Sequence, residues 1–107
     1  MSDAEIPSAR QPAEAEEELP LPPPSFEYLT ISLRMQVEAH LGLLHFGEEK
    51  PPKPDFRAAR HAIDLLAMLE QKTRGNLSLE EQRLLANSLT ELRFRYVQAL
   101  EESRKKE

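Results

Sequence analysis

The sequence predicts an all-α protein of three helices, preceded by a polar tail. Three observations lead to this fold class. Apolar residues recur every three or four positions along three stretches of the chain, which is the period of a helix that buries one face. Segments that contain proline or glycine separate these stretches. No part of the chain shows the apolar–polar alternation of a strand. A chain of 107 residues has room for one domain.

Residues 1–24 differ in composition from the rest of the chain. Of the 19 acidic and 14 basic residues, six acidic and one basic lie here, so this segment carries the net charge of −5 and residues 25–107 are neutral. Its prolines remove backbone hydrogen-bond donors, and its few apolar residues bury too little surface to offset the entropy lost on ordering. We therefore expect a disordered acidic, Pro-rich tail. A stiff solvated leader is the favoured interpretation, and a ligand for a proline-binding groove is the alternative.

The first helix is expected to start after the N-cap Ser25 and to run to about Phe46, with Gly47 as its terminator. It is apolar on two faces. The stripe expected to face the core consists of Phe26, Leu29, Leu33, Val37 and Leu44. The opposite face carries Tyr28, Ile31, Met35, Ala39 and Phe46. One neighbouring layer cannot cover both faces, so we expect a homo-oligomer, most simply a dimer, unless the chain itself grips the helix on both sides.

The second helix is expected over residues 56–74, after a proline-rich loop and the N-cap Asp55. Its core stripe is Phe56, Ala59, Ala62, Ile63, Leu66 and Leu69, widened by Leu65 and Met68. Gly75 is expected to take the left-handed C′ position, and Ser78 with Glu81 to form a capping box. So short a connection predicts that the second and third helices form an antiparallel hairpin.

The third helix is expected from Leu79 to about Ser103, with residues 104–107 as a frayed basic end and residues 25–103 as the folded domain. Its core stripe is Leu85, Leu89, Leu92, Tyr96 and Leu100. Phe94 lies about 180° from this stripe and is a candidate interface residue together with the second face of the first helix.

No catalytic residue, cofactor or metal site is predicted. The absence of cysteine excludes thiolate ligands and cysteine nucleophiles. His40 and His45 point to different sides of a helix, and His61 with Asp64 gives only two ligands. Apolar residues flank Asp64, and pairing about the turn places it near Arg93, so a structural Asp64–Arg93 ion pair is favoured over catalysis.

Basic residues gather on the third helix and raise the alternative of a nucleic-acid partner. They are Arg83, Arg93, Arg95, Arg104, Lys105 and Lys106, with Phe94 among them. Arg93 and Arg95 lie about 200° apart around a helix, so they flank the core stripe and form no single patch. Solvated flanking charges are therefore the favoured interpretation.

Residues 25–100 resemble a bacterial family catalogued as domain of unknown function 1844. The resemblance rests on residues 62–69 (AIDLLAML), 72–77 (KTRGNL), Glu80–Glu81 with Leu84–Leu85, and Leu92–Arg93 followed by Tyr96–Val97. It implies a small helical protein without an assigned activity, and the tail lies outside it.

The expected function is that of a non-enzymatic interaction or assembly module. An RNA-associated accessory protein is the alternative, and an enzyme is the least favoured class. No apolar run is long enough to span a bilayer, and the N-terminus does not read as a signal peptide, so we expect a cytoplasmic protein without membrane partners.

Overall fold

Three helices form the described part of the protein. The structure is a computed structural model that describes residues 20–44, 47, 50 and 52–106. The helices are α2 (Phe26–His40), α3 (Phe56–Lys72) and α4 (Leu79–Lys105). No strand occurs in these residues, so the predicted all-α, three-helix class is confirmed. Residues 1–19 of the predicted tail lie outside the described residues.

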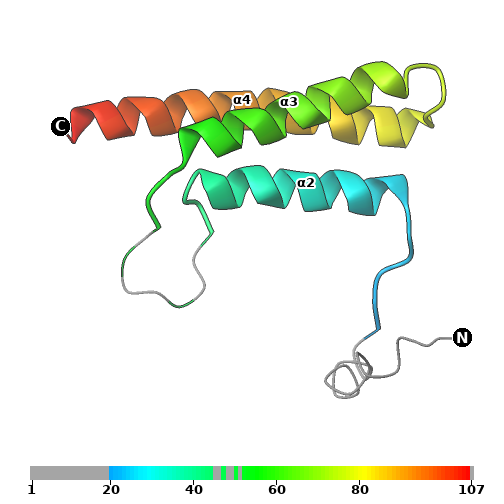
Figure 1. Cartoon of the computed structure of the whole chain (residues 1–107). Coiled ribbons are helices and arrows are strands. Elements are labelled where there is room, and N and C mark those ends of the chain that lie inside the picture. Colours follow the sequence, from blue (N-terminus) through cyan, green and yellow to red (C-terminus); the bar gives the residue numbers. More distant parts are fainter. Residues whose placement is uncertain (1–19, 45–46, 48–49, 51, 107) are drawn as a thin grey trace, which may run out of the picture.

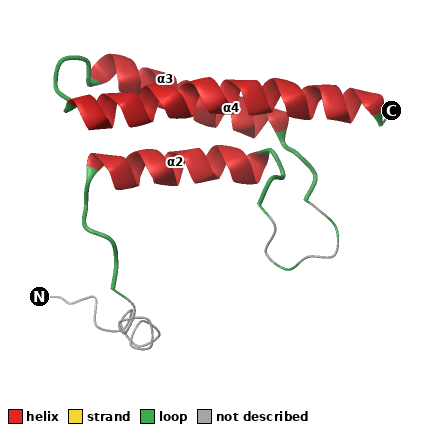
Figure 2. Ribbon diagram, turned by 180° about the vertical axis from the view of Figure 1, so that it is seen from behind, coloured by secondary structure: helices red, strands yellow, loops and turns green. Residues whose placement is uncertain are grey.

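The helices lie side by side, and each reverses the direction of the one before it (Figure 1). α3 and α4 form a pair joined by a short turn, and α2 lies along one side of this pair in both views (Figures 1 and 2). α4 therefore runs in the same direction as α2. All three helices contact one another.

The core lies between the helices and consists mostly of aliphatic side chains. Its buried apolar residues are Val37, Leu41, Ala59, Ala62, Ile63, Leu66, Leu85, Leu89 and Leu92. Those from α3 and α4 all belong to the predicted stripes. Phe56 and Tyr96 pack edge to face, with ring centroids 5.9 Å apart, and join α3 to α4.

The core stripe predicted for α2 is partly wrong. Leu29 is 44% exposed, whereas Thr30 and Leu41 are buried. At about 100° per residue, Leu29 falls about 100° from Thr30, at the margin of the buried side. The buried position 30 tolerates a threonine because the Thr30 hydroxyl donates a hydrogen bond to the carbonyl oxygen of Phe26 at 3.0 Å.

Each helix begins at the N-cap that the sequence predicts. The Ser25 hydroxyl accepts a hydrogen bond from the Tyr28 amide at 3.0 Å, and the Asp55 carboxylate accepts one from the Ala58 amide at 3.1 Å. Ser78 and Glu81 form the reciprocal capping box, with bonds of 3.1 and 2.8 Å. These bonds satisfy amides that have no partner within the first helical turn.

α2 ends earlier than predicted. Its C-cap is Leu41 rather than a residue near Phe46, and Gly42, with φ of 77°, takes the terminating role assigned to Gly47. The Gly42 amide donates to the carbonyl of Ala39, and the Leu43 amide to that of Glu38, which together form a Schellman motif. Phe46 lies outside the described residues.

The following loop is fastened to the end of α2 by two backbone contacts. The Asp55 amide donates to the carbonyl of His40 at 2.6 Å. A Cβ atom on Gly42 would lie 2.5 Å from the carbonyl oxygen of Pro52, so only glycine fits next to this part of the loop.

α3 ends at Lys72, two residues before the predicted end, and its C-cap is Thr73. Gly75 has the expected positive φ, 86°, but lies two residues beyond the C-cap rather than in the C′ position next to it. α4 continues to Lys105, two residues past the predicted Ser103.

Candidate interaction surface

The second apolar face of the first helix is exposed. Tyr28, Ile31 and Met35 are 45%, 43% and 47% exposed, and Ala39 is also exposed. At about 100° per residue these four residues lie about 100° to 180° from the buried Thr30. We call them the outer face of α2. α3 and α4 lie along one side of α2 (Figures 1 and 2), and the outer face of α2 remains exposed.

The outer face of α2 carries no charge. The charged residues of α2 apart from His40 are Glu27, Arg34 and Glu38. All three fall within about 80° of Thr30 around the helix, on one flank of the buried side. Residues between the four apolar positions, such as Ser32 and Gln36, are neutral. Depletion of charge combined with tyrosine and methionine is typical of the centre of a protein interface.

A network of ion pairs borders this face where α2 meets α4. Arg34 bonds Glu91 of α4 at 2.6 Å and Glu38 of its own helix at 3.3 Å, and Arg95 bonds Glu91 at 3.3 Å. We call these four residues the ion-pair network. Burial alone would lower the pKa of Arg34, but its hydrogen bonds to Glu91 and Glu38 outweigh this and raise the pKa. The network contains two acids and two bases, so its net charge is zero.

Sequence reasoning did not find the Arg34–Glu91 bond. The other two ion pairs of the network lie within one helix each and have the i, i+4 spacing that a sequence shows: Arg34 with Glu38, and Glu91 with Arg95. The bond between helices depends on how far α2 is shifted along α4, which no local pattern reveals.

Phe94 does not join the outer face of α2. It is 62% exposed on α4, on the side away from the buried Leu85, Leu89 and Leu92. Val97 is 53% exposed within the next turn. These two residues form a separate, smaller apolar spot.

Asp64 and Arg93 do not form the ion pair expected of them. Both side chains are exposed, and among the described residues no ion pair joins them. Asp64 lies about 140° around α3 from the buried Ala59, on the far side from α4. Counting residues from the turn places Asp64 across from Leu89, one helical turn from Arg93, but does not show on which side of its helix each side chain lies.

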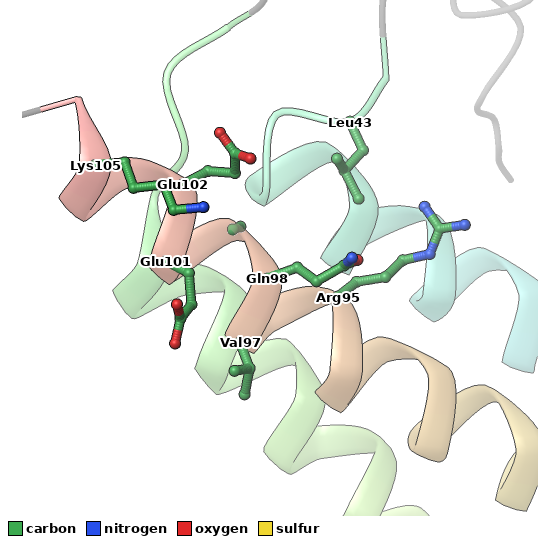
Figure 3. A pocket seen from close by; sticks show the side chains of 8 residues that line it. Leu43, Arg95, Val97, Gln98, Glu101, Glu102 and Lys105 are labelled. Carbon is green, nitrogen blue, oxygen red and sulfur yellow. The ribbon is translucent and has the colours of Figure 1, made fainter.

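A shallow hollow of about 520 Å³ lies where the turn after α2 meets the second half of α4. Leu43 points toward α4 beside Arg95 and Gln98, whereas Val97 and Glu101 point to the other side of α4 (Figure 3). In the described part of the chain, no three acidic or histidine side chains come close enough to hold a metal ion. None of the described helices is both long and apolar enough to cross a membrane.

These features define a class: a small helical protein whose described part consists of three helices, one of which has an uncharged apolar face. Residues 23–98 match a family described as Domain of unknown function (DUF1844), and this covers most of the chain. The protein therefore belongs to that family, as the resemblance of residues 25–100 predicted. Neither the curated proteins nor the solved structures contain a match.

Proposed function

We propose that this protein is a non-enzymatic assembly module that self-associates, most simply as a dimer, through the outer face of α2. The observation that carries the proposal is the exposure of Tyr28, Ile31 and Met35 on a helix face without charge. Contiguous apolar surface of this kind is typical of interaction sites, because water disfavours it on a monomer.

The favoured partner is a second copy of the same chain. Closed two-fold association buries the same patch on both subunits, so one surface serves both partners. An interface one helix wide lies at the small end of specific interfaces, which bury about 1,200 Å² or more in total. Because buried area alone does not set affinity, the protein concentration is varied in the test below.

Sedimentation equilibrium at protein concentrations up to the high micromolar range tests the proposal. The Met35→Glu variant places a charge in the middle of the outer face of α2 and should sediment as a monomer. Met68→Glu is the matched control, since Met68 is 44% exposed on α3 against 47% for Met35. This variant should sediment like the wild type.

Three results would contradict self-association through this face. The wild type could sediment as a monomer, or both variants could behave alike. Loss of helical circular dichroism in Met35→Glu alone would place Met35 in the core of the monomer. Retained helicity in both variants separates a lost interface from a lost fold.

The alternative, an RNA-associated accessory protein, draws on the basic residues of α4. It has less support, because Arg95 is engaged by Glu91 and the acidic and basic residues after residue 24 balance. A nucleic-acid surface needs a clustered basic excess.

A further inference from the structure

The size of the side chains changes along the outer face of α2. The face begins with the large Tyr28, continues with Ile31 and Met35, and ends with the small Ala39. Their spacing of three, four and four residues forms a seam that another helix can follow. The midpoint of this seam lies between residues 33 and 34.

The two ways of pairing such a seam with its own copy differ in packing. A parallel pair would set tyrosine against tyrosine at one end and alanine against alanine at the other, which forces the helices apart at the first end. An antiparallel pair sets Tyr28 opposite the partner's Ala39 and Ile31 opposite the partner's Met35. Large residues facing small ones keep the helices evenly spaced and fill the interface to the density of a protein interior.

The border of the face also suits an antiparallel pair. The two-fold axis of such a pair is perpendicular to both helices, so the same flank of α2 from each copy lies on the same side. The ion-pair network of one copy therefore approaches the network of the other. Each network sums to zero charge, so neither copy brings an excess of one sign to this border.

We infer that a second copy packs antiparallel on α2, about a two-fold axis near residues 33 and 34, with Tyr28 against the partner's Ala39. This geometry rests on the self-association proposed above and specifies how the two copies meet. The helix dipoles then also lie in opposite directions, which favours the arrangement.

Disulfide trapping tests this geometry in the full chain, which contains no cysteine of its own. Tyr28→Cys and Ala39→Cys variants are mixed, one of them carrying a tag so that the mixed dimer has its own mass, and are oxidised gently. The mixed dimer should form several-fold more than either self-linked dimer. In the antiparallel pair, Tyr28 lies about 16 Å along the axis from the partner's Tyr28, beyond the reach of a disulfide.

A second pair guards against a variant that fails to fold. Ile31→Cys mixed with Met35→Cys should also give the mixed dimer, and Met68→Cys on α3 supplies the background. Self-linking of Tyr28→Cys alone above that background would show a parallel pair and overturn the inference.

Failure of this geometry is distinguishable from failure of the proposed function. A wild type that sediments as a dimer, while neither mixed pair links above the Met68→Cys background, overturns the α2 pairing but leaves self-association standing. A wild type that remains a monomer at high micromolar concentration removes both.

Discussion

α2 and α3 are helices of similar length that pack against each other and against α4, yet their outward sides differ. The outer face of α2 is apolar and uncharged. The outward side of α3 carries four charged residues, Arg57, Arg60, Asp64 and Lys72, together with His61 and Met68. Neither outward side contributes to the core of the monomer, so the stability of the monomer does not explain why one is apolar and the other charged. The α3 side has the composition of a surface that stays in water, and this difference supports the proposed association through the outer face of α2.

The ends of the two helices offer the largest contrast. Gly42→Ala should destabilise the protein by about 3 kcal/mol, because a positive φ is strained and the new Cβ meets the Pro52 carbonyl at 2.5 Å. Gly75→Ala should cost about 1 to 2 kcal/mol, since no atom lies within 4 Å of the added Cβ. Urea unfolding of both variants measures the difference. Equal losses would mean that the loop over Gly42 moves aside freely.

The beginnings of the two helices should behave alike. Ser25→Ala and Asp55→Ala each remove one side-chain acceptor from a first-turn amide and should each cost about 1 kcal/mol. Thermal and urea denaturation report the two losses. If Ser25→Ala had no effect while Asp55→Ala did, α2 would owe nothing to its cap, and the contrast between the helices would extend to their start.

α2 and α3 also differ, by a smaller free energy, in the side-chain ion pairs that join them to α4. A double-mutant cycle with Arg34→Met and Glu91→Gln should give a coupling of about 0.5 kcal/mol, because both side chains are partly exposed and water screens the charges. The same cycle with Asp64→Asn and Arg93→Leu should be additive. Coupling in the second cycle would restore the Asp64–Arg93 pair that the structure does not form.

The smallest expected effect concerns RNA. Binding of single-stranded RNA at about 150 mM salt should be undetectable, since exposed basic residues of the folded part are balanced by acids. Fluorescence anisotropy across a salt series makes the measurement. Binding that weakens steeply with salt and disappears in an Arg93→Ala/Arg104→Ala variant would contradict this expectation and assign the functional surface to α4.

The parts of the fold that the sequence predicts are those with local causes. The caps at Ser25, Asp55 and Ser78 need only residues within one turn, and the core stripes of α3 and α4 stand out against charged neighbours. α2 lacks that contrast, because it is apolar on both sides. Its buried side was therefore misplaced by one residue at Leu29, where Thr30 is buried instead.

The errors share a dependence on distant parts of the chain. Gly42 and Gly47 are the same residue type, and what distinguishes Gly42 is the close approach of Pro52, ten residues later. The Arg34–Glu91 bond likewise joins residues 57 positions apart. For the candidate surface, the sequence predicted the second face of α2, while the network that borders it required the packed helices.

The fastening of the loop after α2 has a consequence for chain length. The His40–Asp55 hydrogen bond and the Gly42–Pro52 contact hold both ends of this loop in place, independently of what lies between them. Once the ends are held, the entropy of closing the loop grows only with the logarithm of its length, and each doubling costs about 0.6 kcal/mol. An epitope or a small domain inserted near Gly47 would therefore leave the three helices in place.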